Sequence, residues 1–438
     1  MNDDRTIFAL ASAAGKAGVA VFRVSGREAA RAIEKLCGSA TLPEPRRAVM
    51  RELKNPQSGE TIDRALVLYF KAPHSFTGED VVEFQTHGGR AVTQAIVEAL
   101  QALPAFRLAE PGEFTRRAFE NRRMDLTEAE AVADLVHADT EAQRRQALRQ
   151  MDGVLGKIYE DWRARLAQSL AYMEAAIDFA DEDLPEDLAE KQNAALQILR
   201  ADIAAHLNDN RRGERLREGF SVVLLGAPNA GKSSLLNALA QREAAIVAPT
   251  AGTTRDVIEV HLDIGGYPVM LADTAGLRES TEEIESEGIR RARARAKTAD
   301  MKLLILDADA LAATPRDMID GNTIVVMNKI DLAPAAAPED AVAVSALTGA
   351  GIETLLGKLA HEIDMRFSGS GAPPLTRARH RAALEECCEH IDRALGAAQP
   401  DLRAEDVRLA MRALGRITGR VDVEDLLDVI FRDFCIGK

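Results

Sequence analysis

A glycine-rich run between an expected strand and an expected helix constrains this chain more than any other feature. Residues 226–233 read Gly-Ala-Pro-Asn-Ala-Gly-Lys-Ser, which fits the pattern Gly-x-x-x-x-Gly-Lys-Ser/Thr. The run follows an apolar strand expected at 221–225 and precedes a helix expected at 234–240. There the glycines let backbone N–H groups approach phosphates, and the helix start adds its positive end. The run therefore predicts a phosphate-binding loop.

The residues around this loop predict the class of domain that carries it. Apolar runs at 269–272, 303–306 and 323–327 alternate with segments of helical periodicity. Strands that are apolar throughout, with helices between them, are typical of a parallel sheet covered on both faces. We therefore expect an α/β P-loop domain over residues 218–364.

Two short segments indicate which base the site accepts. The segment 328–331, Asn-Lys-Ile-Asp, follows the last of these strands, and the Asp331 carboxylate can accept hydrogen bonds from guanine N1–H and N2–H₂. Adenine lacks these donors, and a polar site left without its partner discriminates by orders of magnitude. The segment 345–347, Ser-Ala-Leu, offers the backbone N–H of Ala346 as a further contact. The sequence therefore predicts GTP in a Ras-like P-loop G domain.

Hydrolysis of GTP requires Mg²⁺, and the sequence offers groups for it. Ser233 is an expected Mg²⁺ ligand, Thr254 is the expected switch threonine, and Asp273 is expected beside the ion. Lys232 would contact the β- and γ-phosphates, and the N–H of Gly276 would lie near the γ-phosphate. These groups occur in the order that a GTPase needs.

One departure concerns the attacking water. Leu277 stands where many GTPases have the glutamine that orients this water. Leucine neither donates nor accepts a hydrogen bond, so another group must take the role. The glutamates between 279 and 287 are candidates, although a run of this kind is usually a solvated helix start.

Charge and cysteine use limit the classes of function. The 55 Lys and Arg against 69 Asp and Glu give a net charge of −14, which argues against non-specific nucleic-acid binding through counterion release. No apolar stretch approaches the ~20 residues of a membrane span, and the acidic start leads into no secretory signal. The four cysteines form no Cys-x-x-Cys pair. We expect reduced thiols, a cytoplasmic location and no membrane contact.

Outside the P-loop domain the sequence shows two patterns of secondary structure. Residues 1–119 alternate strand-like runs with turns and two helical segments, which predicts α+β structure. The pattern then becomes helical, and apolar residues at intervals of three or four from Leu148 to Met173 predict one long helix. Helices resume after Pro373-Pro374. The simplest architecture is an α/β domain inserted into a helical domain.

Several longer motifs go beyond a generic P-loop domain. They are Ser75-Phe-Thr-Gly-Glu-Asp-Val81, His87-Gly-Gly89, Pro111-Gly-Glu-Phe-Thr-Arg-Arg-Ala-Phe119, Asn229-Ala-Gly-Lys-Ser-Ser234, Ala251-Gly-Thr-Thr-Arg-Asp256, Asp273-Thr-Ala-Gly-Leu-Arg278 and the terminal Cys435-Ile-Gly-Lys438. On these residues the chain resembles the MnmE (TrmE) family of tRNA-modification GTPases over essentially its full length. The terminal tetrapeptide and the 111–119 segment are far more specific than the P-loop.

The resemblance implies a fold and a function. It implies an N-terminal dimerisation and folate-binding-like domain at 1–119, a helical domain in two parts, 120–217 and 365–438, and an inserted G domain at 218–364. It also implies a homodimer that acts with an FAD-dependent partner, MnmG (GidA), on the wobble uridine of certain tRNAs. An aminomethyl or carboxymethylaminomethyl group would be installed at C5 of the uridine. A tetrahydrofolate derivative, of the 5-formyl or 5,10-methylene type, would supply the one-carbon unit.

The resemblance further implies a folate site in the outer domains. Its contacts would be Arg23, Glu83, Arg123 and Lys438, with Arg123 standing where many members have lysine. Cys435 is a candidate reactive or positioning thiol.

The resemblance also implies what replaces the missing glutamine. Family members use K⁺ in place of an arginine finger, and the matching ligands are the Asn229 side chain and the carbonyls of Ala248, Thr250 and Thr253. A cation there offsets charge that develops on the leaving oxygen. The acid that orients the water would be Glu285.

The catalytic groups are thus expected to be Glu285, Lys232 and Gly276. The residues expected to contact GTP are Asn229, Ala230, Gly231, Lys232, Ser233, Ser234, Ala248, Pro249, Thr250, Ala251, Gly252, Thr253, Thr254, Asp273, Thr274, Ala275, Gly276, Asn328, Lys329, Ile330, Asp331, Ser345, Ala346 and Leu347.

The main alternative is an Era-like switch in ribosome assembly, whose G domain reads much the same. Era-like proteins carry a small RNA-binding domain with a Gly-x-x-Gly loop after the G domain, whereas residues 377–434 read as helices and lack that loop. A basic helix expected at 290–297 is a candidate for RNA contact. The glutamates before it can pair with its arginines, which favours a solvated helix face instead.

Overall fold

A computed structural model of the chain describes residues 4–178, 188–227, 229–242, 245–246, 259–273, 295–308, 319–332, 338, 340–367, 374–421, 424–432 and 434–437. By residue contacts the chain falls into two compact units. The first contains Met1–Val136, Gln150–Asp178 and Pro400–Lys438, and the second contains His137–Arg149 and Phe179–Gln399. These units group residues that touch one another, so the domain boundaries drawn from the sequence remain predictions.

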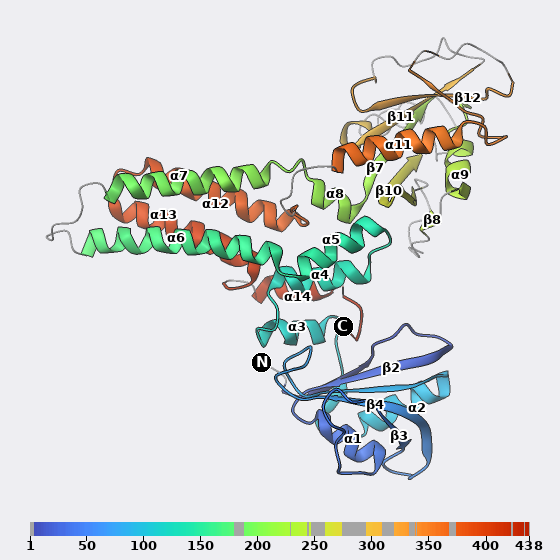
Figure 1. The fold of residues 1–438 in the computed structure, drawn as a ribbon, viewed down its shortest axis with the longest axis vertical. Helices are drawn as coiled ribbons and strands as arrows, with labels where there is room; N and C mark the ends of the chain where they lie inside the picture. Colours follow the sequence, from blue (N-terminus) through green and yellow to red (C-terminus); the bar gives the residue numbers. More distant parts are fainter. Residues whose placement is uncertain are drawn as a thin grey trace, which may run out of the picture. The chain divides into compact units, whose positions relative to one another are not determined.

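The first unit contains a six-stranded sheet with two helices on one face (Figure 1). The strand order is β3-β4-β5-β2-β1-β6, antiparallel except for the pair β1 and β6. The elements are β1 (Thr6–Leu10), β2 (Ala17–Ser25), α1 (Ala29–Cys37), β3 (Val49–Lys54), β4 (Thr61–Phe70), β5 (Val81–Gly88), α2 (Arg90–Gln101) and β6 (Phe106–Leu108). Ile33 of α1 and Ile96 of α2 pack with Phe22 and Phe84 of the central strands. The expected α+β structure is confirmed.

Helices complete the first unit. They are α3 (Glu113–Glu120), α4 (Leu126–Val136), α6 (Val154–Asp178), α13 (Pro400–Thr418) and α14 (Glu424–Arg432), while α5 (Glu141–Met151) has residues in both units. α6 and α13 lie side by side (Figure 1). Leu126 of α4 is buried with Phe431 and Phe434. This cluster brings the end of the chain against the helices that follow the sheet.

The apolar stripe from Leu148 to Met173 does not lie on one helix. α5 ends before Gly153, whose φ of +73° leaves the helical region, and α6 begins directly after it. A Cβ on Gly153 would lie 2.9 Å from Oε1 of Glu128, a residue that caps the start of α4. Leu148 and Met151 are exposed, whereas Met173 is buried. The expectation of a single helix was wrong at this break.

The second unit contains a seven-stranded sheet of order β13-β12-β11-β7-β10-β9-β8. Its elements are α7 (Leu188–Leu207), α8 (Arg212–Glu218), β7 (Phe220–Gly226), α9 (Lys232–Arg242), β8 (Ala245–Ile246), β9 (Glu259–Ile264), β10 (Tyr267–Asp273), β11 (Met301–Asp307), β12 (Thr323–Asn328), β13 (Val342–Ala343), α11 (Ile352–Phe367) and α12 (Ala378–Gly396). The strands from β10 to β13 through β7 are parallel, and β8 and β9 extend one edge in antiparallel pairing.

Burial on both faces explains why these strands read as apolar throughout. Val222 and Leu224 of β7 pack with α9 and α11, while Val223 and Leu225 face a second cluster. Because β7, β10 and β12 are parallel, the segments after them meet at one edge of the sheet. Within the described ranges, no helix combines the length and the apolar character that crossing a membrane requires.

Candidate functional site

The glycine-rich loop follows β7 and leads into α9, as the sequence predicts. Gly231 has a φ of +89°, and a Cβ on it would collide with the side-chain amide nitrogen of Asn328. That nitrogen donates to the carbonyl of Ala230 at 3.0 Å. Asn229 has a φ of +65°, a conformation that asparagine tolerates better than most residues. The loop is thus fixed against the end of β12.

Lys232 is the buried cation of this loop. It is 6% exposed, and its Nζ donates to the carbonyls of Gly226 and Ala227, each at 2.9 Å. Burial lowers the pKa of Lys232, and the charge of Asp273 acts in the opposite direction. The ammonium group is therefore held at the loop that the sequence assigns to phosphates.

Ser233 and Asp273 bring two side-chain oxygen groups together. The hydroxyl of Ser233, at the start of α9, donates to Oδ2 of Asp273 at 2.6 Å, and Asp273 ends β10 with 1% of its surface exposed. Mg²⁺ is commonly held by one or two protein oxygens together with substrate phosphates. The pair fits such an ion, with Ser233 as ligand and Asp273 beside it.

Asn328 joins the glycine-rich loop to the segment that contains Ala346. Its amide nitrogen bonds Ala230, and its Oδ1 accepts the N–H of Ala346 at 3.0 Å. Asn328 itself is 2% exposed. The N–H that the sequence assigns to guanine therefore donates to Asn328 in this structure, and its contact with guanine stays a prediction.

The remaining base-side residues lie around Asn328. Lys329 has a φ of +66°, and its Nζ donates to Oδ2 of Asp307 at 2.6 Å. Ser345 is fully buried, and its Oγ accepts the N–H of Thr348. Asp331 is exposed. The Asp331 carboxylate is thus accessible to a ligand, and the neighbouring Lys329 is held by its ion pair with Asp307.

Arg23 and Glu83 come together in the first unit. They are paired residues on β2 and β5, and Nε of Arg23 donates to Oε1 of Glu83 at 3.0 Å. Nη1 of Arg23 donates to the carbonyl of Gly437 at 3.5 Å. The guanidinium lies 5.6 Å from the ring centroid of Phe76 and 5.8 Å from that of Phe114. Gly437 of the C-terminal segment therefore contacts this ion pair.

Two further residues that the sequence assigns to this region, Cys435 and Arg123, are also described by the structure. Cys435 is exposed, and its carbonyl accepts the N–H of Gly112 at 3.4 Å. Arg123 lines a cavity of about 620 Å³ together with Arg122 and Arg420. The structure thus joins Arg23, Glu83 and the tail directly, and it places Arg123 on that cavity.

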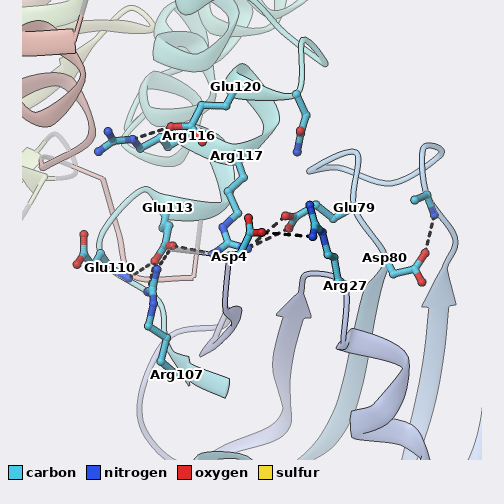
Figure 2. A pocket seen from close by; sticks show the side chains of 12 residues that line it. Asp4, Arg27, Glu79, Asp80, Arg107, Glu110, Glu113, Arg116, Arg117 and Glu120 are labelled. Atoms are coloured by element: carbon cyan, nitrogen blue, oxygen red, sulfur yellow. Dashed lines mark hydrogen bonds and ion pairs between the residues drawn. The ribbon is translucent and has the colours of Figure 1, made fainter. Parts of the chain in front are cut away.

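The motif at the start of α3 builds a network of ion pairs around a cavity of about 790 Å³ (Figure 2). Arg107 donates to both carboxylate oxygens of Glu113 at 2.6 and 2.7 Å, and Arg117 donates to Glu113 and Glu79 at 3.1 and 3.2 Å. Burial alone would raise the pKa of Glu113. The Arg107 hydrogen bonds, the Glu110 N–H and the two arginine charges outweigh burial and lower it. Glu113 therefore stays ionised and ties α3 to the sheet.

Comparison with known proteins decides the family. A family description, "GTP-binding protein TrmE N-terminus", matches residues 6–123, and another, "MnmE helical domain", matches residues 126–435. The tRNA modification GTPase MnmE of Paramagnetospirillum magneticum is 54% identical over 441 residues, which cover 99% of each chain. The chain belongs to the MnmE family of tRNA modification GTPases. The resemblance read from the sequence is confirmed, and the Era-like alternative is set aside.

Other relatives agree with the MnmE assignment. MnmE of Parvibaculum lavamentivorans is 54% identical over 99% of this chain and 100% of its own. The mitochondrial 5-taurinomethyluridine-[tRNA] synthase subunit GTPB3 of Danio rerio is 48% identical over 99% of this chain and 93% of its own. Among solved structures, the G domain of the T. maritima FeoB iron transporter matches 33% of this chain and 98% of its own, with 26% identity and a TM-score of 0.26. This MnmE-family chain is a GTPase.

Part of the predicted MnmE-type site lies outside the described residues. These positions are Ala248, Pro249, Thr250, Ala251, Gly252, Thr253, Thr254, Thr274, Ala275, Gly276, Glu285 and Lys438. Their assignments stay predictions.

Sequence reasoning missed some residues that support the site. Asp307 ends β11 and accepts Lys329, in the same way that Asp273 ends β10 beside Ser233. An acid at the end of an apolar run was the available signal. Phe76 and Phe114 lie within motifs that carried the MnmE resemblance, but nothing in their spacing placed them beside Arg23.

Proposed function

We propose that this chain is a K⁺-stimulated GTP hydrolase that acts as a cytoplasmic homodimer in the modification of tRNA wobble uridine. Its partner would be the FAD-dependent MnmG, and the group installed at C5 would be of the aminomethyl or carboxymethylaminomethyl type. One observation carries the proposal: the P-loop, the Ser233–Asp273 pair and Asn328 meet at one sheet edge in a member of the MnmE family.

The geometry supports a division of roles in the nucleotide site. The N–H groups of the loop and Lys232 would bind the phosphates, and Ser233 and Thr254 would hold Mg²⁺ with Asp273 beside it. Asp331 would accept the guanine N–H groups. Bound Mg²⁺ would offset negative charge on the phosphates as the bond to the leaving oxygen breaks.

A monovalent cation and a carboxylate would complete the site. We assign K⁺ to the Asn229 side chain and the carbonyls of Ala248, Thr250 and Thr253, and we assign the water-orienting role to Glu285. Since Leu277 offers no hydrogen bond, Glu285→Ala should lose turnover and keep GDP affinity, measured by phosphate release and by titration with fluorescent GDP. An unchanged hydrolysis rate would move the role to a neighbouring glutamate.

The first unit would bind the one-carbon donor. A carboxylate held beside a guanidinium, with two aromatic rings near by, suits a flat heterocycle that carries N–H donors, as tetrahydrofolate derivatives do. Arg123 and Lys438 would complete the contacts, and exposed Cys435 would lie two residues before Gly437, whose carbonyl accepts from Arg23.

Two adjacent exposed apolar side chains on the first sheet, Met50 and Leu66, support a homodimer. Met50 of β3 pairs with Leu66 of β4, Leu66 pairs with Gln85 of β5, and Gln85 pairs with Val21 of β2, so the four side chains share one face. Met50 is 61% exposed and Leu66 is 37% exposed. Met50 and Leu66 are thus adjacent exposed apolar side chains, and such a surface suits coverage by a partner.

Nucleoside analysis of tRNA tests the proposed function. A strain that lacks this chain should lose the modified wobble uridine, and restoring the chain should return it. Restoring a Lys232→Ala variant should not, because the phosphate-binding ammonium is removed. Unaltered tRNA nucleosides in the strain that lacks the chain would contradict the proposal.

A further inference from the structure

A cavity of about 350 Å³ lies along α6 and α13 in the first unit. Four arginines and one glutamate line it together with an apolar surface: Arg163, Arg408, Arg412, Arg420 and Glu405, then Leu409, Met411, Gly415 and Val421. Four guanidinium groups around one cavity are unexpected for a chain of net charge −14.

The end of α13 shapes one wall of this cavity. The N–H of Arg420 donates to the carbonyl of Gly415 at 2.8 Å, a hydrogen bond that turns the chain back over the last helical turn. A Cβ on Gly415 would lie 2.6 Å from Cγ2 of Val421, so the returning segment packs closely on the helix. Arg420 and Val421 are thereby held against the cavity.

Carboxylates orient three of the arginines without surrounding them. Arg408 donates to Glu174 at 2.8 Å and also to Glu405, yet its side chain keeps 48% of its surface exposed. Glu160 pairs with Arg163 at 3.3 Å and with Arg420 at 2.5 Å. A guanidinium carries five N–H donors, so one or two carboxylate contacts leave others for a second acceptor.

The arginines that line the cavity form its rim, and Leu409, Met411 and Val421 form its apolar floor. Together they select a class of ligand. Guanidinium groups bind phosphates, and a flat ring can lie on an apolar floor or on a guanidinium plane. An unpaired nucleotide of RNA supplies both parts, and proteins recognise RNA mainly through such splayed-out bases. An acidic peptide would match the rim and leave the apolar floor without a partner.

A second cavity connects this surface to the one-carbon chemistry. Arg420 also lines the cavity of about 620 Å³ that Arg122 and Arg123 line, so the two cavities share one lining residue. Arg123 is a predicted contact of the one-carbon donor. An RNA strand that crosses Arg420 would therefore pass from the first cavity to the cavity that Arg123 lines.

We propose that the cavity along α6 and α13 binds an unpaired nucleotide of the substrate RNA, with its phosphate on Arg408, Arg412 and Arg420 and its base on the apolar floor. This inference rests on the proposed role in tRNA modification. It locates RNA contact on the helical part of the first unit rather than on the basic segment 290–297.

Charge reversal at Arg408 tests the phosphate contact. Full-length chain is titrated, alone and with the FAD-dependent partner, against fluorescent anticodon stem-loop RNA at two salt concentrations. Arg408→Glu should weaken RNA binding about tenfold. It should also reduce the slope of log binding constant against log salt concentration by about one. The matched control is Arg47→Glu, because Arg47 forms the same i,i+3 pair with Glu44 on the exposed surface. The control should stay within about twofold of wild type.

Filling the floor tests the base contact without changing charge. Met411→Trp should reduce the preference for the stem-loop over a fully paired RNA of equal length, and thermal unfolding checks that both variants fold. Wild-type RNA affinity in both folded variants would overturn the inference, as would loss of binding to a protein partner with RNA binding unchanged. If wild type restores the modified nucleoside while Arg408→Glu binds RNA normally, only this surface is refuted. If wild type restores none, the proposed function fails as well.

Discussion

Asn328 shows at the scale of one residue how the nucleotide site holds together. Its amide bonds the carbonyl of Ala230 in the P-loop and the N–H of Ala346 in the base-side loop. The side chain is almost fully buried, so losing either partner would leave a polar group unsatisfied in the interior. One amide therefore couples the glycine-rich loop to the segment that is predicted to contact the base.

Asp331 is the residue predicted to set the base preference, and a substitution that exchanges one carboxylate oxygen for an amide nitrogen tests this role. In Asp331→Asn an amide replaces the carboxylate that would accept guanine N1–H and N2–H₂, whereas xanthine presents a carbonyl at that position. Affinity for GTP should fall by about 100-fold or more, and affinity for xanthosine triphosphate should rise. Titration with fluorescent nucleotides measures both. The control is Leu332→Asn, at a neighbouring residue that is 65% exposed. Unaltered GTP affinity in Asp331→Asn would contradict the guanine assignment.

Asn229 carries the cation prediction. Hydrolysis should be at least about tenfold faster in K⁺ than in Na⁺, because a fitted cation offsets charge on the leaving oxygen. Asn229→Gly removes the side-chain oxygen while the φ of +65° stays accessible, so it should abolish the difference between the two salts. Phosphate release at equal ionic strength is the measurement. Equal wild-type rates in the two salts would rule out the cation role.

At the scale of elements, the turn before α11 fixes the base-side loop. The N–H of Ser345 donates to the carbonyl of Ala350, and Gly351 follows with a φ of +73°. A Cβ on Gly351 would collide with the carbonyl of Ala343 at the end of β13. The loop that holds Ala346 therefore depends on a glycine at the start of the helix.

Two glycine-to-alanine changes test this dependence. Gly351→Ala should destabilise the second unit by about 2 kcal/mol or more, because it adds both strain and a clash. Gly357→Ala lies within α11, where an added Cβ meets open space, and should stabilise the unit by about 0.5–1 kcal/mol. Denaturant unfolding of the two variants measures the difference. Equal stabilities would contradict the role given to Gly351.

Sequence patterns predicted the central parallel strands of the second sheet, and the strands and breaks that they missed have physical causes. The strands around β7 were evident because both of their faces are buried. β9 was missed because Glu259–Ile264 is only partly buried, although Gly265-Gly266 between two strand-like runs is a hairpin signal. The break at Gly153 was missed because the apolar spacing continues across it.

The candidate site shows the same limit. The P-loop, Asp273 and the 328–331 segment were predictable because each follows a strand at a fixed place in the fold. The bond from Ala346 to Asn328, and the aromatic rings beside Arg23, join segments far apart in sequence. Local patterns carry no information about such contacts.

At the scale of the whole molecule, the exposed side chains of Met50 and Leu66 on the first sheet bear on assembly. Met50→Glu places a charge on edge strand β3, in the surface proposed to join two chains, and burying an unpaired charge is costly. The variant should be a monomer in light scattering at concentrations where wild type is a dimer, and its K⁺-stimulated hydrolysis should fall if G domains act in pairs. Leu108→Glu is the matched control, since Leu108 is 45% exposed on the opposite edge strand β6. A dimer of unchanged mass in Met50→Glu would show that the chains join through another surface.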